Sequence, residues 1–344
     1  MATALACAAD SASAIDPLAD VLRRVKLSGA LFFLIDAGAP WRVDVPQGDS
    51  FASVILPGAQ HVISYHIVTR GSCWGGLNGE APIGLETGDI IVIPHGDAYA
   101  MAITPNDPAQ MDPATVLGFF RSMAAGELPF TIEEGGGGPG RLNLVCGFLG
   151  CDVRPFNPLL ATLPRLLHVP RPPHSDTDML GKLIELTLAE SRRPRAGSEA
   201  IRVRLSELLF VEVVRRYIDA LPAGQNGWLA GLRDPLVGRA LARLHERLAH
   251  PWTLEELAAT VGASRSTLAE RFTQFVGQPP MQYLTQWRMQ VAARLLADGT
   301  MKVSAIACEV GYASEAAFSR AFAKAAGSSP ANWRRALLAG RPSP

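Results

Sequence analysis

The sequence predicts a multidomain β + α chain, with an N-terminal region of short strands and an all-helical C-terminal region. Three observations support this prediction. Between residues 28 and 148, short apolar runs are separated by Gly, Pro, Asp and Asn, which is typical of an all-β sandwich or barrel. Residues 179–219 carry two helical apolar patterns, and residues 254–333 carry one helical pattern twice. The 344 residues are 48% hydrophobic and 19% charged, which suits two or three ordinary globular domains.

The net charge of zero conceals an uneven distribution along the chain. Residues 230–344 hold 14 Lys and Arg against 8 Asp and Glu, and because the whole chain has 32 of each, residues 1–229 hold 18 against 24. A basic C-terminal part beside an acidic remainder indicates that the C-terminal part meets phosphate. A chance imbalance of charged residues between the two parts would give the same counts.

Nothing in the sequence predicts export or membrane anchoring. No stretch is long and apolar enough to cross a bilayer, and the N-terminus lacks the basic region and apolar core of a secretion signal. The cysteines are odd in number and unevenly spaced, which argues against a disulfide framework and for a reducing cytoplasm. They are Cys7, Cys73, Cys146, Cys151 and Cys308.

One domain is expected over residues 16–170, after a flexible tail of residues 1–15. It begins with a short amphipathic helix over residues 16–25, because apolar residues recur there three or four apart. The strand-like runs follow. Residues 120–141 contain a glycine run and are predicted to form a mobile loop.

A helical hairpin over residues 171–221 is predicted next. Its second helix carries more apolar residues than a solitary hairpin can cover. These residues are therefore expected either to be buried within the monomer or to contact a partner. These residues are Ile201, Leu205, Leu208, Leu209, Val211, Val213 and Val214. Residues 222–233 are predicted to be a linker, because they begin with the small and polar PAGQNG.

The repeat in residues 254–333 keeps apolar type, Gly, Ser and Pro in the same order in both copies. The first copy reads Leu254, Leu257, Ala258, Val261, Gly262, Ser264, Leu268, Phe272, Gly277, Pro280, Tyr283. The second reads Val303, Ile306, Ala307, Val310, Gly311, Ser314, Phe318, Phe322, Gly327, Pro330, Trp333. An internal repeat of this kind indicates one supersecondary unit used twice.

Each copy is predicted to be a helix, a tight turn and a second helix. Gly262 and Gly311 fall where the first helix must end, a position that favours a left-handed conformation. Ser264 and Ser314 then offer a hydroxyl to the free N–H groups at the start of the second helix. Such a helix-turn-helix can place its second helix in a DNA major groove.

Residues 280–297 between the copies are predicted to form one long helix. Its length would be roughly 27 Å at 1.5 Å per residue. A rigid spacer of that size could hold two recognition helices about 34 Å apart, so that both enter the same face of one duplex.

At these residues the chain resembles the AraC/XylS family of bacterial transcription regulators. The resemblance covers residues 234–338 and rests on LEELAATVGASRSTLAERF, GQPPMQYLTQWRMQVAARLL, VSAIACEVGYASEAAFSRAF and GSSPANWRR. It implies a DNA-binding domain over that range, followed by a short tail over residues 339–344. One departure is Glu270, where the family often has a basic residue, as the second copy has at Arg320.

The recognition helices supply the candidate DNA-binding residues. In the first copy, Arg265, Ser266, Thr267 and Glu270 are predicted to read bases, and Ser264 and Arg271 to lie nearer the backbone. The second copy offers Ser314, Glu315, Ala317, Ser319 and Arg320, and its alanine makes it the poorer reader. An ordinary solvated helix face is the alternative for these polar side chains.

The segment GDIIVIPHGDAY resembles a sequence motif of cupins, which are small jelly-roll β-barrels. Cupin enzymes usually have a metal-binding His where this chain has Tyr99. His61, His66 and His95 follow the enzyme spacing poorly, so a metal-free effector pocket is favoured over a catalytic metal site. The predicted pocket residues are His66, Cys73, Trp74, His95, Tyr99 and Cys146.

Two readings of the cysteines stay open. Cys73 and Cys146 could react with an oxidant as thiolates, or could be small buried hydrophobes, which is the commoner behaviour of free Cys. Cys308 occupies a helix position in the second copy and is predicted to pack.

The sequence therefore predicts a ligand-responsive transcription factor and not an enzyme. Its resemblance to this class of regulator favours a homodimer through the hairpin helices. The expected partners are double-stranded promoter DNA, a small-molecule effector, a second copy and RNA polymerase, with no membrane, metal or cofactor. The alternatives are a metal-dependent cupin enzyme with a DNA-binding appendage, and an architectural DNA binder without an effector.

Overall fold

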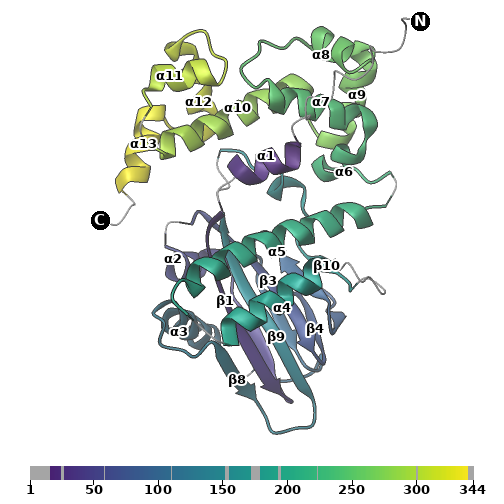
Figure 1. Ribbon diagram of the computed structural model, residues 1–344, viewed down its shortest axis with the longest axis vertical. Helices are drawn as coiled ribbons and strands as arrows, with labels where there is room; N and C mark the ends of the chain where they lie inside the picture. The colour runs from purple at the N-terminus through teal and green to yellow at the C-terminus, as the bar shows by residue number, and fades with distance from the viewer. Residues whose placement is uncertain are drawn as a thin grey trace, which may run out of the picture. The chain divides into compact units, whose positions relative to one another are not determined.

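The computed structural model describes residues 16–24, 27–57, 59–109, 111–151, 155–171, 179–192, 195–222, 224–299 and 301–339. They form two compact units (Figure 1). We call residues 26–153 with 163–221 the sheet unit, and residues 1–25, 154–162 and 222–344 the helical unit. The predicted tail at residues 1–15 and the last five residues of the chain lie outside the described residues.

Two β-sheets build the sheet unit. Its elements are β1 (Leu27–Gly38), β2 (Arg42–Val45), η1 (Gly48–Ser50), α2 (Ala52–Ile55), β3 (His61–Arg70), β4 (Ser72–Leu77), β5 (Ile83–Glu86), β6 (Ile90–Ile93), β7 (Tyr99–Ala102), α3 (Pro113–Ala124), β8 (Thr131–Gly135), β9 (Arg141–Cys151), β10 (Leu167–Val169), α4 (Met179–Arg192) and α5 (Ser198–Ala220). One sheet has six strands in the order β10-β6-β3-β9-β1-β8, and the other has four in the order β2-β7-β4-β5. Only the β1–β8 pair among these described strands is parallel.

The two sheets share one apolar core. Phe33 and Phe148 of the six-stranded sheet belong to the same buried cluster as Leu85 and Met101 of the four-stranded sheet. Because alternate residues of a strand face opposite sides, each sheet gives one apolar face to this core. The prediction of a sheet-rich domain is confirmed for this region, although helices α2 and α3 lie between its strands.

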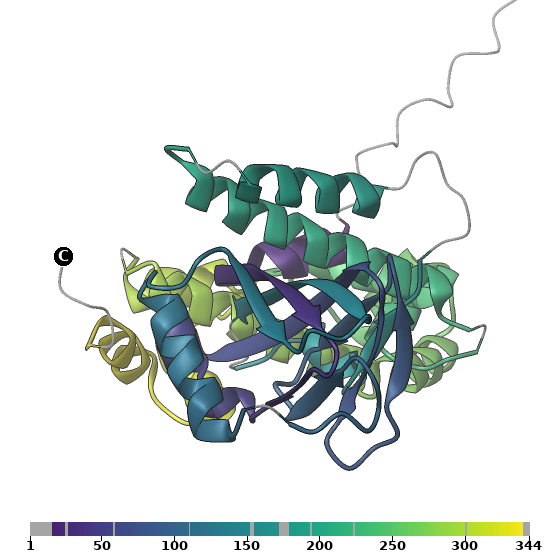
Figure 2. The ribbon, with the colours of Figure 1, turned by 90° about the horizontal axis from the view of Figure 1, so that it is seen from below.

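Helix α5 covers the outer face of the six-stranded sheet, and α4 lies against α5 (Figure 2). The Tyr65 hydroxyl and the Ser206 hydroxyl lie 2.8 Å apart in a buried hydrogen bond between β3 and α5. Residue 147, opposite Tyr65 on β9, must be glycine because a Cβ there would collide with the tyrosine ring. The tyrosine thus reaches across its neighbouring strand to anchor the hairpin.

The segment 120–141 was predicted to be a loop, and this prediction is wrong. Asp112 accepts a hydrogen bond from the Thr115 N–H at 2.7 Å and begins α3, which continues through Phe120 to Ala124. Strand β8 then pairs with β1. An Asp-Pro helix start was therefore overlooked beside the more conspicuous glycines.

The helical unit contains both predicted helix-turn-helix motifs. Its elements are α1 (Pro17–Arg24), η2 (Leu160–Thr162), α6 (Trp228–Arg233), α7 (Pro235–Glu246), α8 (Leu254–Thr260), α9 (Arg265–Val276), α10 (Pro280–Ala297), α11 (Val303–Glu309), α12 (Glu315–Ala326) and α13 (Pro330–Ala339). Gly262 and Gly311 have φ angles of 73° and 82°, in the left-handed region predicted for the two turns. The long helix α10 was also predicted correctly.

Residues 16–170 were predicted to form one domain, whereas the structure groups residues 1–25 and 154–162 with the helical unit. Val21 of α1 is fully buried, and the Asp20 carboxylate lies 2.8 Å from Nδ1 of His245 on α7. The Phe156 N–H donates to the side chain of Gln290 on α10 at 3.0 Å. These contacts link residues distant in sequence, so chain order did not reveal them.

The predicted linker is also shorter than expected. Its second half forms α6, and the Trp228 side chain is 1% exposed and donates to the Tyr283 hydroxyl at 3.0 Å. An indole that is buried and hydrogen-bonded is part of a folded core. Across the described ranges, no helix is long and apolar enough to span a membrane.

Candidate functional site

Helices α9 and α12 are the second helices of the two helix-turn-helix motifs. The Ser264 hydroxyl accepts from the Thr267 N–H at 3.1 Å, and the Ser314 hydroxyl accepts from the Ala317 N–H at 3.2 Å. Each helix buries two apolar residues completely. These are Leu268 and Phe272 in α9, and Phe318 and Phe322 in α12. The cap fixes where each helix begins, and the buried pair fixes which face points outward.

The outward face of α9 carries most of the predicted base-reading residues. Arg265, Ser266, Thr267 and Glu270 are all exposed. The Arg265 guanidinium pairs with Glu255 of α8, and its side chain is 66% exposed. A backbone hydrogen bond and then this arginine lower the pKa of Glu255. The arginine is thus oriented at the surface by a carboxylate that a phosphate or a base edge could replace.

Arg271, which was predicted to lie near the DNA backbone, makes an ion pair within the helical unit. Its guanidinium nitrogens lie 2.6 and 2.8 Å from Oδ2 of Asp234, whose carboxylate is 3% exposed and also caps α7. Burial would raise the pKa of Asp234, but hydrogen bonds from Arg271, Val237 and Leu236 outweigh it and lower the pKa. Arg271 therefore joins α9 to the start of α7.

On α12, Ser314, Glu315 and Arg320 are exposed, whereas Ala317 and Ser319 are half-buried. Sequence reasoning missed two further exposed side chains that share these faces. Gln274 lies four residues after Glu270, and Lys324 lies four residues after Arg320. The i,i+4 spacing of a helix was the signal that could have identified them.

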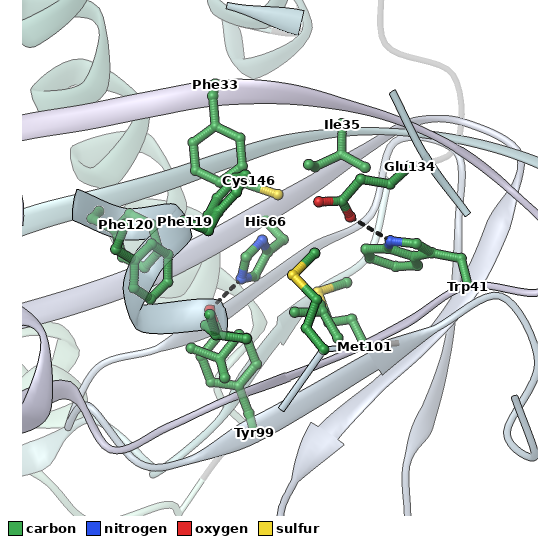
Figure 3. A pocket seen from close by; sticks show the side chains of 15 residues that line it. Phe33, Ile35, Trp41, His66, Tyr99, Met101, Phe119, Phe120, Glu134 and Cys146 are labelled. Carbon is green, nitrogen blue, oxygen red and sulfur yellow. Dashed lines mark hydrogen bonds between the residues drawn. The ribbon is translucent and has the colours of Figure 1, made fainter. Parts of the chain in front are cut away.

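The sheet unit encloses a largely apolar pocket of about 440 Å³, a volume that includes space open to solvent (Figure 3). It is lined by Phe33, Ile35, Trp41, Val43, Val45, His66, Tyr99, Met101, Met111, Val116, Phe119, Phe120, Glu134, Cys146 and Phe148. Strands from both sheets and helix α3 therefore contribute to its walls.

Three polar side chains interrupt these apolar walls. Nε2 of His66 lies 2.6 Å from the Tyr99 hydroxyl, and burial lowers the pKa of His66 to about 3. Burial has the opposite effect on the phenol and raises the pKa of Tyr99, so both side chains are neutral at physiological pH. Across the pocket, Glu134 accepts a hydrogen bond from the Trp41 indole N–H at 2.6 Å, and burial raises the pKa of this carboxyl.

The structure brings three of the six predicted pocket residues together, namely His66, Tyr99 and Cys146. Cys73 is buried in the core without lining this pocket. Trp74 is 38% exposed on β4 and lines a different hollow, and His95 bonds through Nε2 to the Leu163 carbonyl at 2.8 Å.

Sequence reasoning missed the aromatic wall of the pocket. Phe33 and Ile35 alternate on one face of β1, and this two-residue period could have identified them. Phe119 and Phe120 lie on α3, in or beside the segment that was assigned to a loop. Glu134 lies on β8, in the same segment.

The cysteines divide by burial. Burial raises the pKa of Cys73 to about 12 and raises the pKa of Cys146 well above its usual value. Cys308, predicted to pack, is instead exposed on α11, because it lies one residue beyond the buried Ile306–Ala307 pair. Among the described residues, no three His, Cys, Asp or Glu side chains lie close enough to hold a metal ion.

Two capped helix-turn-helix units beside a sheet domain with an apolar pocket are typical of DNA-binding regulators that carry a second domain. A cupin family model matches residues 16–219, and a helix-turn-helix domain model matches residues 257–336. A Streptomyces lividans protein described as AraC-like is 35% identical over 325 residues, which cover 93% of this chain and 98% of that protein. The chain belongs to the family of AraC-like transcription regulators, and the resemblance seen in its sequence is confirmed.

Other relatives agree with this family. The transcriptional regulator AlkR of Acinetobacter baylyi is 32% identical over 282 residues, covering 80% of this chain and 89% of that protein. The solved DNA-binding domain of the transcriptional factor AdpA, in complex with a target DNA, is 36% identical over 32% of this chain and 99% of that domain, with a TM-score of 0.31. The two family models and the relatives from Streptomyces lividans and Acinetobacter baylyi show that the chain is a DNA-binding transcriptional regulator with a cupin-like domain.

Proposed function

We propose that this regulator reads promoter DNA with α9 and α12 together and responds to a small molecule bound in the sheet-unit pocket. The observation that carries the DNA half is that both recognition helices begin at a capping serine and turn polar side chains outward. Helix α10 has 18 residues and would span roughly 27 Å, a spacing suited to successive major grooves.

Footprinting on a bound promoter tests this arrangement. We expect protection of two major grooves on one duplex face, about 34 Å apart, for each protein chain. Protection of a single groove per chain, or affinity equal to that for random DNA, would overturn the proposal.

We assign base reading in α9 to Arg265, Ser266, Thr267 and Glu270. The Arg265→Ala variant is expected to lose about 1 to 3 kcal/mol of binding free energy and to relax the preference at one base pair. Arg165→Ala is the matched control, because that arginine is 59% exposed in the sheet unit. An equal loss on every DNA sequence would assign Arg265 to phosphate contact instead.

We further propose a homodimer that forms through α4 and α5. Four large apolar side chains on these helices are between 44% and 56% exposed, namely Met179, Leu186, Ile201 and Leu208. Exposed apolar residues gathered on one hairpin are typical of an interface. Leu208→Glu should yield monomers in sedimentation equilibrium, whereas Arg204→Gln, an exposed polar control on α5, should not.

Signalling requires that the effector bind unequally to the free and the DNA-bound forms. The affinity for operator DNA should therefore change when the pocket is filled, and the affinity for effector should change by the same factor with DNA. Identical effector affinity with and without operator would refute this coupling. We propose that this regulator acts in the cytoplasm, where promoter DNA and RNA polymerase meet, and that it acts without catalysis, metal or cofactor.

A further inference from the structure

We propose that the effector is a small apolar molecule that carries a basic nitrogen, and that Glu134 of the sheet-unit pocket binds this nitrogen. This inference rests on the proposed effector role of the pocket and names the chemical class of its ligand. It is carried by three features, which are the aromatic walls, the sign of the available charge, and an unpaired buried nitrogen.

The aromatic walls of the pocket favour a ligand that is mostly apolar. Besides His66 and Tyr99, five aromatic residues of the described chain line the cavity, and they come from β1, the segment after β1, α3 and β9 (Figure 3). They are Phe33, Trp41, Phe119, Phe120 and Phe148. Aromatic faces also attract cations, so an apolar ammonium gains from the same walls that exclude water.

The charge of the residues that line the pocket favours a cationic group on the ligand. No Lys or Arg is among the residues that line the pocket, and Glu134 is its one acidic residue. The structure records one hydrogen bond for this carboxylate, from the Trp41 indole N–H to Oε2. The indole holds Oε2 at the apolar wall, and Oε1 has no hydrogen bond from the described residues, so it can accept one from a ligand. A carboxylic acid ligand would meet like charge here without a cation to offset it.

The neighbouring titratable groups do not alter this sign. His66, Tyr99 and Cys146 line the same cavity, and burial keeps each of them uncharged near neutral pH. The charge of an ionised Glu134 would therefore not be offset by these neighbours. A bound cation would in turn favour the ionised carboxylate, which burial disfavours.

His66 supplies a second polar contact. Its side chain is 4% exposed, and Nδ1 is buried with no hydrogen-bond partner among the described residues. Nε2 is already paired with the Tyr99 hydroxyl. Buried polar atoms are nearly always hydrogen-bonded in native proteins, so an unpaired nitrogen in the wall of a cavity points to a ligand group that completes it.

A matched series of probes tests the proposal on the full-length protein without DNA. Phenylethylamine, phenylethanol and phenylacetate share one ring and differ in charge, and calorimetry gives their affinities. We expect the amine to bind at least about tenfold more tightly than the alcohol, and the acid to bind least. Equal binding of the three, tighter binding of the acid, or no binding of the amine at millimolar concentration would overturn the assignment.

The variant Glu134→Gln tests the residue itself. Its amide oxygen can still accept from Trp41, so we expect the alcohol to retain its affinity while the amine loses its advantage. Glu133→Gln is the matched control, because that carboxylate is exposed on the neighbouring position of β8. Unchanged amine affinity in Glu134→Gln would overturn the role of this residue. If Glu134→Gln fails to fold, the probe series on the unmodified protein still decides the ligand class. Promoter footprinting without ligand tests the DNA-binding proposal separately.

Discussion

Substituting Asp20 should destabilise helices that lie more than two hundred residues later in the chain. Asp20 lies on α1, is 3% exposed, and accepts a hydrogen bond from Nδ1 of His245 at 2.8 Å. Nε2 of the same imidazole lies 2.8 Å from the Tyr283 hydroxyl, which also accepts from the Trp228 indole. An indole only donates, so all of these bonds are satisfied when Tyr283 donates to Nε2 and the Nδ1–H of His245 donates to Asp20.

The structure sets the expected magnitude. A hydrogen bond to a charged group is worth about 1.5 to 3 kcal/mol, and Asp20→Ala removes one that is wholly buried. Arg23→Ala is the control, because Arg23 pairs with the same carboxylate at 3.7 Å but is 66% exposed. Exposed pairs contribute about 0 to 1 kcal/mol, so the control should change little.

Hydrogen–deuterium exchange of the full-length protein locates the effect. Amides of α7 and α10 that exchange through unfolding of the helical unit should exchange roughly ten to a hundred times faster in Asp20→Ala. The Arg23→Ala variant should resemble the unmodified protein. Unchanged exchange in α7 and α10, with faster exchange confined to α1, would refute the conclusion that α1 is part of this domain.

Three further predictions follow from single contacts. Ser264→Ala removes the cap of α9 and should lower the stability of the helical unit by about 1 kcal/mol in thermal unfolding, whereas an aspartate there should not. Iodoacetamide should modify the exposed Cys308 well before Cys146, because burial raises the pKa of Cys146 and keeps its thiol protonated. Rapid modification of Cys146 in peptide mass spectra would contradict this prediction. The pKa of Asp234 is lowered in the folded state, so its contribution to stability is full above its unfolded pKa of about 3.9 and is lost as the pH falls through the folded pKa. In acid unfolding, Arg271→Ala should therefore be less stable at neutral pH and show a weaker loss of stability below about pH 4, and an unaltered acid profile would argue against the ion pair.

Local sequence signals predicted the recognition helices well because their determinants are local. Gly262 and Ser264 define a turn and a cap within three residues, and the buried pair Leu268 and Phe272 follows from a four-residue spacing. The same signals, shifted along the chain, predicted the second unit. A short-range rule suffices wherever the partner of a residue is less than two helical turns away.

The pocket was predicted only in part. His66, Tyr99 and Cys146 were anticipated from a motif, whereas the wall formed by Phe119 and Glu134 was not. Those two residues lie on α3 and β8, in a segment whose glycines outweighed its helix and strand signals. A pocket is lined by residues from several strands, and a single sequence does not show which strands are neighbours in the sheets.

The sequence by itself determined two helix-turn-helix units, a long helix between them and a preceding region of strands, because periodicity, caps and turn glycines act between near neighbours. Only the tertiary structure decided that α1 packs with the helices at the other end of the chain, that Arg271 holds Asp234, and that Glu134 is the acidic group of an aromatic cavity. Each of these depends on side chains that are distant in sequence and meet only when burial of apolar surface brings their elements together.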